Sequence, residues 1–362
     1  MTIPPYQVQE LITSVLSELT GSLVQGIQIR CGQALGSEIY IGCSNGELMR
    51  FALQDGNSTS ATDPYTILSR QSVSNDKPIE DIVLLPSISR ALVFSDNQIH
   101  FYTLPTLDVV QNIKPIRHVV TFAVDQRHLA RPPPQTSAPP HRSEPVDFCV
   151  IKRSSLAMFS LGTQRLIYQK ACCNLPEFPL PQGGVLACRL GYTLCIADKT
   201  HYNMLNLETA EIYPILPLNQ DYQSPDLPVE PFIVPTGEND FLLVSWTGQN
   251  SMGIFITPSG EPVRGTLTWS QHPTSICLDL PHATAILPDG SIEVHNIDSL
   301  ELVQVIPPPS GDGPLDRTRL ISSALGYVVP SSQASSKLHK VPVKLDRGSA
   351  SKQVTVSVES SS

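Results

Sequence analysis

Two stretches of the chain, "DNQIHFYTLPTLDVVQNI" at 96–113 and "DGSIEVHNIDSLELVQVI" at 289–306, repeat one pattern. Asp, Ile, Leu, Val, Gln and Ile recur at matching positions: 96 and 289, 99 and 292, 107 and 300, 110 and 303, 111 and 304, 113 and 306. Internal repeats are typical of propellers, solenoids and other arrays. This repeat therefore constrains the fold more than any other feature of the sequence.

Each copy consists of short runs of β-forming residues between turn residues. In the first copy the runs are "RALVF" (90–94), "QIHFYTL" (98–104) and "VVQNI" (109–113), and residues 283–306 repeat them. Runs of this length, separated by Asn, Asp, Gly and Pro, indicate an antiparallel meander.

The same pattern recurs along most of the chain. Its first turns fall near residues 45, 96, 154, 198, 248 and 289, and a weaker copy follows at 326–345. Intervals of roughly 40–50 residues are typical of one four-stranded blade. The sequence therefore predicts an all-β fold, a seven-bladed β-propeller, with the repeated stretches as inner hairpins of two blades. The segment "YQVQELI" (6–12) is expected to add a strand to the last blade.

We expect one propeller domain over residues 1–345, with disordered insertions near 54–77 and 131–145. The second insertion, "RPPPQTSAPPHRSEP", is rich in proline, which disfavours helix interiors and central strands. Residues 346–362 are expected to be a polar tail or the start of a following region.

The charge of the chain limits its partners. Net charge is −9, the isoelectric point is about 5.4, and no segment is strongly basic. These values argue against nucleic acid as a partner and allow membrane contact only indirectly. No basic residue precedes Arg30, so a secretory signal is not expected. Eight scattered cysteines are then expected to be free, buried thiols in a reducing cytosol.

Motif searches give weak candidates for chemistry. The P-loop, H-E-x-x-H and G-x-S-x-G patterns are absent. His272, His282 and Asp279 share one segment, and a metal site there would require all three to converge. Adjacent Cys172 and Cys173 point to opposite faces of a strand, so packing is favoured over metal binding.

The remaining candidates also have simple structural interpretations. Trp246 and Trp269 are expected to anchor blade packing, and the Glu80–Asp81 pair to carry solvated loop charges. The sequon at 57–59 is expected to stay unmodified. The sequence thus predicts no enzyme activity, no catalytic or metal-binding residue, and no cofactor.

Residues 240–306 resemble the late blades of citron homology (CNH) domains. The family pattern has an acidic residue, F-L-L, G-[VI]-F, a turn glycine and a tryptophan before a proline; these fall here at Glu238, Phe241–Leu243, Gly253–Phe255, Gly260, Trp269 and Pro273. The segment "IYIGCSNGELMRFAL" resembles the first blade of the family, with Cys43 where threonine is usual.

Among citron homology proteins, residues 5–345 look most similar to vacuolar protein sorting tethers: the Vam-type subunit of HOPS, its CORVET counterpart and TGF-β receptor-associated proteins. This resemblance implies a Rab-type small GTPase and other tethering-complex subunits as partners. It implies a cytoplasmic protein, peripheral on the endosome or vacuole membrane. Tethers of this type carry an α-solenoid after the propeller; the 362 residues show no such region, so we expect either a fragment of a longer protein or a propeller alone. Their GTPase contacts form no linear motif, so no contact residue is predicted.

Two other functions remain open at this stage. A citron-domain regulator of Rho-type GTPase signalling would share the fold, and helical repeats beyond residue 362 would favour the tether instead. A propeller hydrolase, such as a lactonase or glycosidase, would need metal ligands or carboxylates converging on the central channel.

Overall fold

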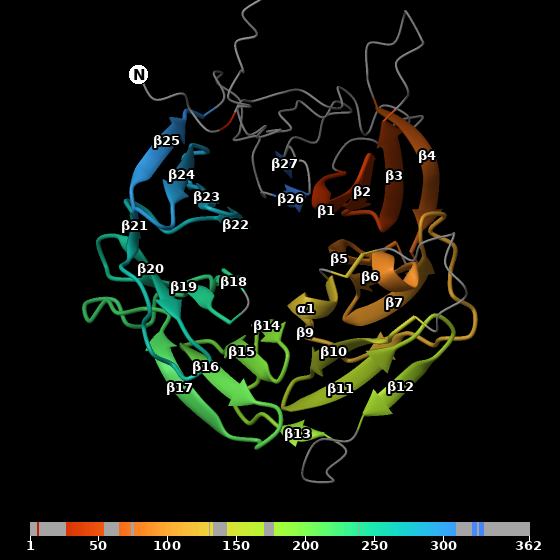
Figure 1. Ribbon diagram of the computed structural model, residues 1–362, viewed down its shortest axis with the longest axis horizontal. Helices are drawn as coiled ribbons and strands as arrows, with labels where there is room; N and C mark the ends of the chain where they lie inside the picture. Colours follow the sequence, from red (N-terminus) through yellow and green to blue (C-terminus); the bar gives the residue numbers. More distant parts are fainter. Residues whose placement is uncertain are drawn as a thin grey trace, which may run out of the picture.

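Short antiparallel strands and tight turns form nearly the whole of the computed structural model, as the alternating runs predict. The structure describes residues 6, 27–53, 65–73, 76–129, 131–132, 143–169, 177–237, 239–308, 321–323 and 326–328. Sheets succeed one another around a central axis in chain order, which is the arrangement of a β-propeller (Figure 1).

Six sheets form the blades, and the strands of each follow one another from the axis outward. Blade 1 holds β1 (Ile29–Leu35), β2 (Glu38–Cys43), β3 (Glu47–Leu53) and β4 (Tyr65–Ser72). Blade 2 holds β5 (Ile79–Leu85), β6 (Arg90–Ser95), β7 (Gln98–Thr103) and β8 (Ile116–Arg117). Blade 3 holds β9 (Thr121–Val124), β10 (Val146–Ile151), β11 (Ser155–Leu161) and β12 (Leu166–Gln169), and β13 (Phe178–Pro179) also pairs with β11.

The other three blades are built in the same way. Blade 4 holds β14 (Leu186–Leu190), β15 (Thr193–Ala197), β16 (His201–Asn206) and β17 (Ile212–Pro217). Blade 5 holds β18 (Ile233–Pro235), β19 (Phe241–Trp246), β20 (Ser251–Ile256) and β21 (Leu267–Trp269). Blade 6 holds β22 (Ser275–Asp279), β23 (His282–Ile286), β24 (Ile292–Asn296) and β25 (Leu302–Ile306).

The prediction of seven blades is wrong, because the described residues build six. The seventh was inferred from the weak copy at 326–345, of which the structure describes only β27 (Gly326–Val328). β27 pairs with β26 (Ile321–Ser323) as a two-stranded sheet, and β26 lies against β1 and β22. The weak copy lacks the uninterrupted apolar runs of the other units, and two paired strands are not a blade.

The repeated stretches have the same local structure but do not form inner hairpins. Each spans the second turn of its blade, the third strand and the connection to the fourth strand. Leu107 and Leu300 both have positive φ, 63° and 61°. Tyr102 pairs with Val109 as His295 pairs with Leu302. The blades then diverge: 109–113 is not the expected strand, because the outer strand of blade 2 is β8.

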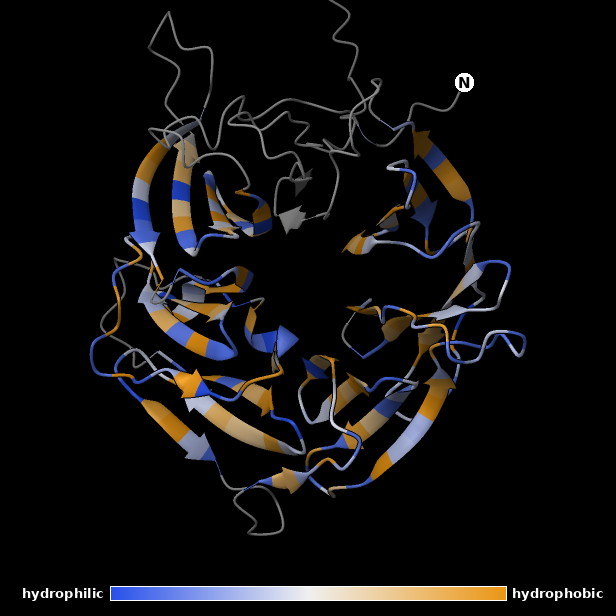
Figure 2. Cartoon of the chain, turned by 180° about the vertical axis from the view of Figure 1, so that it is seen from behind, coloured by the Kyte–Doolittle hydropathy of each residue, from blue (hydrophilic) through white to orange (hydrophobic). Residues whose placement is uncertain are grey.

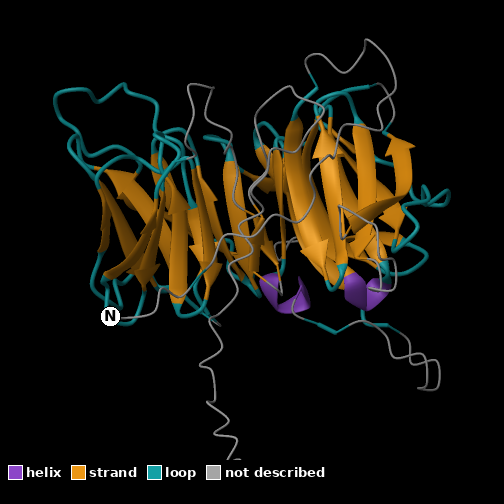
Figure 3. Cartoon of the chain, turned by 90° about the horizontal axis from the view of Figure 1, so that it is seen from above, coloured by secondary structure: helices purple, strands orange, loops and turns teal. Residues whose placement is uncertain are grey.

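The antiparallel strands give the ring two faces. Connections from first to second and from third to fourth strands lie on one face, together with helix α1 (Gln126–Leu129) and the 3-10 helix Pro86–Ile88 (Figure 3). We call this the helix face. The second-to-third turns and the connections between blades lie on the opposite side, the loop face. All six predicted turn positions are second-to-third turns and lie on the loop face.

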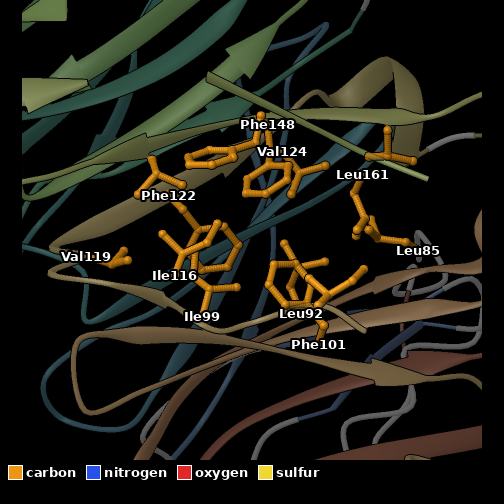
Figure 4. Packing of buried hydrophobic residues seen from close by; sticks show 14 of the residues in the cluster. Leu85, Leu92, Ile99, Phe101, Ile116, Val119, Phe122, Val124, Phe148 and Leu161 are labelled. Carbon is orange, nitrogen blue, oxygen red and sulfur yellow. The ribbon is translucent and has the colours of Figure 1, made fainter. Parts of the chain in front are cut away.

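The core lies between the blades. Hydrophobic and hydrophilic residues alternate along the strands (Figure 2), so each blade presents apolar side chains to its neighbours. Between blades 2 and 3, Leu92, Ile99 and Phe101 pack against Phe122 and Phe148 (Figure 4). This packing holds the first strands around the axis as a rigid lining.

Several predicted segments are only partly described. Of the insertion expected near 54–77, residues 65–72 form β4, while 54–64 lie outside the described residues. Residues 133–142 of the second insertion, the tail 346–362 and residues 7–12 also lie outside them. Tyr6 is described and packs in the hydrophobic cluster of blade 6, the last complete blade.

Candidate functional site: the central channel and the loop face

First strands from all six blades line the central channel. On the helix-face side a cavity of about 790 Å³ is bounded by residues of β1, β5, β9, β14, β18 and β22. Its lining mixes apolar side chains, such as Leu35 and Phe122, with polar ones, such as Gln33, Asp81 and Thr236. Asp81 is the one carboxylate among these lining residues, so the described lining holds no pair of carboxylates of the kind that glycoside hydrolysis uses.

The loop-face mouth of the channel is more polar. A second cavity of about 690 Å³ is lined there by Gln28, Arg30, Glu80, Glu230 and Ser275 among others. Arg30 and Glu80 form an ion pair at 2.9 Å, and both side chains are more than two-fifths exposed. The pair joins blade 1 to blade 2, and exposed pairs of this kind contribute little stability.

The three metal-ligand candidates of the sequence, His272, His282 and Asp279, do not converge. His282 and Asp279 meet instead at the Tyr6 hydroxyl, which donates to Asp279 Oδ2 at 3.3 Å and lies 3.0 Å from His282 Nδ1. His272 belongs to a different group of side chains, described next. Within the described part of the chain, no three His, Cys, Asp or Glu side chains are grouped to hold a metal ion.

His272 forms a pair with Ser251 that the sequence did not reveal. The Ser251 hydroxyl lies 2.8 Å from His272 Nδ1, and His272 Nε2 lies 2.8 Å from the Glu230 carbonyl oxygen. Since a carbonyl only accepts, Nε2 carries the proton and Nδ1 accepts from Ser251. This resembles a nucleophile–base pair, but Ser251 is fully buried. The pair therefore joins β20 to the connections on either side of blade 5.

A buried ion pair joins blades 3 and 4. Asp125 and Arg189 lie 4.0 Å apart and are almost wholly buried. Asp125 Oδ1 also accepts from the backbone N–H groups of Gly191 at 3.1 Å and Arg127 at 3.0 Å. These hydrogen bonds compensate for the desolvation of the carboxylate, so the group is well formed as a structural link.

The described cysteines are structural. Six are free and buried: Cys31, Cys43, Cys149, Cys188, Cys195 and Cys277. Burial raises the pKa of Cys188 to about 12 and that of Cys149 to about 11. Such thiols are protonated at neutral pH and are poor nucleophiles. The prediction of free buried thiols is confirmed for these six, while Cys172 and Cys173 lie outside the described residues.

The other sequence candidates are also placed by the fold. Trp269 is fully buried between blades 5 and 6, which confirms its predicted packing role. Trp246 is partly exposed and meets the His272 ring edge-on. Glu80 and Asp81 lie in β5 rather than in a loop. The sequon at 57–59 and Glu238 lie outside the described residues.

These features define a β-propeller whose buried polar groups mainly join neighbouring blades. A CNH domain model matches residues 36–312. The chain belongs to the CNH domain family, which confirms the resemblance found in the sequence.

Two relatives match most of this chain. The chain is 25% identical over 303 residues to transforming growth factor-beta receptor-associated protein 1 of Mus musculus, covering 82% of this chain and 32% of that protein. It is 22% identical to vacuolar protein sorting-associated protein 3 of Saccharomyces cerevisiae, covering 83% and 27%. The chain thus spans about a third or less of the length of these relatives.

Solved structures agree on the fold. The structure titled AfRom2 CNH domain matches with a TM-score of 0.57 at 17% identity, over 89% of this chain and 95% of that one. The WD40 domain of Neurospora crassa Pan2 matches with a TM-score of 0.59 at 10% identity, over 92% and 95%. Among the described residues, no helix has the length and apolar character needed to cross a membrane.

Proposed function

We propose that this chain is the protein-interaction propeller of a vesicle-tethering subunit of the CORVET or HOPS type, acting at the endosome or vacuole. The similarity to a vacuolar protein sorting-associated protein over 83% of the chain carries this proposal. In this role the propeller binds other tethering subunits and a Rab-type GTPase, needs no cofactor and turns over no substrate. The GTPase, being lipidated, holds the protein peripherally on the membrane.

The fold suits this role. Rigid blades present connecting loops on a broad face, and loops on a rigid scaffold are common binding elements. Ser251, the hydroxyl beside His272, is fully buried, so this pair offers no accessible nucleophile. A net charge of −9 also opposes direct contact with an anionic bilayer.

Nucleotide dependence tests the proposal. Purified chain is assayed against endosomal and vacuolar Rab proteins loaded with GDP or a non-hydrolysable GTP analogue. We expect binding to the GTP-analogue form of at least one, because GTP orders the switch loops. Equal binding to both forms of every Rab would refute the GTPase role. Binding of the chain alone to liposomes would refute indirect recruitment.

A further inference from the structure

A continuous arc of turns crosses the loop face over blades 2, 3 and 4. The Val119 N–H donates to the Asn97 carbonyl at 2.9 Å, which links the connection after β8 to the turn of blade 2. The Val120 N–H donates to the Ile151 carbonyl at 2.9 Å, which links the same connection to blade 3. The Val185 N–H donates to the Ala197 carbonyl at 2.8 Å, which links the next connection to blade 4. These bonds fix neighbouring turns against one another, so their exposed side chains form one surface.

Three basic residues project from this arc, one from each successive segment: Arg117, Arg153 and Lys199. All three are exposed, and no described residue forms an ion pair with any of them. Lys152, next to Arg153, is different because it pairs with Glu177. We call Arg117, Arg153 and Lys199 the basic arc.

Carboxylates near the basic arc are mostly occupied. Asp198 precedes Lys199 but is buried, and its Oδ1 accepts from the backbone of Thr200 at 2.7 Å and His201 at 2.8 Å. These hydrogen bonds hold the pKa of Asp198 below its usual value despite burial. Asp96 is an exposed carboxylate, and it lies in the turn of blade 2, at one end of the arc. The arc therefore has a local positive excess.

The loop face over blades 5 and 6 has the opposite charge. Over blades 5 and 6 its exposed or partly exposed acidic residues are Asp221, Asp226, Glu230 and Asp289. The whole chain has a net charge of −9. A basic arc on an acidic protein attracts anionic groups locally, while the remaining surface orients them.

Exposed apolar side chains lie within the arc. Val120 is 41% exposed and lies directly before β9, and Val185 is 45% exposed and lies directly before β14. A mixture of basic and apolar side chains suits a protein segment. An anionic bilayer is a poorer fit, because lipid-binding patches typically use about 4–8 basic residues, and a flat membrane would also meet the acidic half of the face.

We propose that the basic arc, with Val120 and Val185, docks an acidic segment of a partner protein that carries interspersed apolar residues. Carboxylates of the segment pair with Arg117, Arg153 and Lys199, and its apolar side chains cover the two valines. This docking does not depend on the GTPase role proposed above, so either can fail without the other.

Charge reversal tests the docking surface. Variants Arg117→Glu, Arg153→Glu and Lys199→Glu are compared with Arg165→Glu, an arginine on the helix face that is also exposed. The probe is a labelled synthetic peptide of alternating glutamate and leucine, followed by fluorescence anisotropy with the 362-residue chain. We expect each arc variant to weaken binding about fivefold to tenfold at low salt, and Arg165→Glu to leave it unchanged.

Further arms separate the alternatives. Binding should weaken as salt is raised, and the same peptide with lysine in place of glutamate should not bind. If arc variants lose no more affinity than Arg165→Glu, the proposal is refuted. The chain could instead fail to bind the peptide and bind phosphatidylserine vesicles in a way that the arc variants abolish. The ligand would then be a membrane, and the proposal would also be refuted. Circular dichroism of each variant verifies folding.

Discussion

Tyr202 joins two blades through a single hydroxyl group. The side chain is fully buried in β16 of blade 4, and its hydroxyl donates to the Val244 carbonyl of blade 5 at 2.7 Å. It also accepts from the Phe232 N–H at 2.9 Å. Tyr202→Phe leaves two buried backbone groups without this partner, so we expect a loss of about 1–3 kcal/mol in unfolding free energy.

Urea denaturation of both proteins measures this loss. Tyr222→Phe is the matched control, since that side chain is 98% exposed and its hydroxyl remains in water. An equal stability for Tyr202→Phe and the wild type would mean that the inter-blade hydrogen bonds contribute nothing.

His295 makes stability depend on pH. Burial lowers its pKa to about 4, and the ring packs edge-on against Trp269. Because the folded-state pKa lies below the unfolded value of 6.5, the unfolded chain binds the proton first as pH falls. Stability is therefore fully present above about pH 6.5 and is lost as pH falls toward 4. Between pH 7 and pH 5 we expect His295 to account for about 2 kcal/mol.

The His295→Phe variant isolates this contribution. Unfolding free energies at pH 7 and pH 5 should differ less in the variant than in the wild type, whatever its absolute stability. His100, His128 and His272 also have pKa values lowered by burial, so a smaller dependence in the same direction should remain. An unchanged pH dependence in the variant would contradict the assignment to His295.

The connection from third to fourth strand begins with the same hydrogen-bonded turn in several blades. The next-to-last residue of this turn has positive φ, and the acidic residue after it closes the turn through its carbonyl; the positions are Leu107, Ala210, Gly260 and Leu300. Ala210 has φ of 68° and Gly260 has φ of 85°. A side chain is strained in this region, so Ala210→Gly should raise unfolding free energy by up to about 1 kcal/mol.

The reciprocal change is the control. Gly260→Ala should destabilise by about 1 kcal/mol, since a Cβ there would also lie 3.3 Å from the Tyr213 ring. Thermal or urea unfolding measures both variants. Two changes of the same sign would show that backbone conformation does not decide these positions.

The proline-rich insertion is expected to be dispensable for stability. Arg131 Nη1 donates to the Pro145 carbonyl at 3.0 Å, so the ends of this connection already lie together. Replacing residues 133–142 by a short glycine–serine linker should shift the melting temperature by only a few degrees, because loop entropy changes slowly with length.

Removing part of the connection at 218–232 provides a contrast. There Asn219 Nδ2 donates to the Ser224 carbonyl at 2.8 Å, and Gln220 N–H donates to Trp246 at 2.7 Å. Deleting residues 221–227 should lower the melting temperature much more. Similar losses from both deletions would mean that the proline-rich insertion is packed.

Sequence patterns predicted the elements better than their number or their place in the ring. Turns at Asn45–Gly46 and Asp289–Gly290 were found because their residues favour the required backbone conformation. The displaced outer strand of blade 2 was missed, since its position depends on pairing with β7 rather than on its own residues. Seven blades were predicted because spacing alone cannot distinguish a weak copy from a blade.

Ring geometry, not local sequence, creates the contacts between distant residues. Ser251 is hydrogen-bonded to His272, and Asp125 forms an ion pair with Arg189. Tyr6 is hydrogen-bonded to Gln304 in blade 6, a residue near the other end of the described chain. Nothing in a linear pattern marks these partners, because each appears only after the blades are arranged around the axis. The basic arc was missed for the same reason: its residues lie in separate segments, and no single segment is strongly basic.

Tyr6 fastens the beginning of the chain to blade 6. Its backbone N–H donates to Gln304 Oε1 at 3.2 Å, and Gln304 Nε2 donates to its carbonyl at 3.0 Å. Its ring is almost fully buried beside Cys277 and Ile292, and its hydroxyl reaches Asp279. This one residue therefore links the start of the chain to the last complete blade through both packing and hydrogen bonds.

Replacing Tyr6 tests how far this contact supports the whole ring. Tyr6→Ala removes a buried aromatic side chain and should cost about 3–5 kcal/mol. Tyr6→Phe keeps the packing and should cost about 1 kcal/mol through the lost hydroxyl contacts. Hydrogen exchange should accelerate in β24 and β25 of Tyr6→Ala before it does so in blade 3, whereas Tyr222→Ala should match the wild type. Uniform acceleration across all blades would instead mean that the propeller opens as one cooperative unit, and unchanged exchange would mean that Tyr6 does not stabilise blade 6.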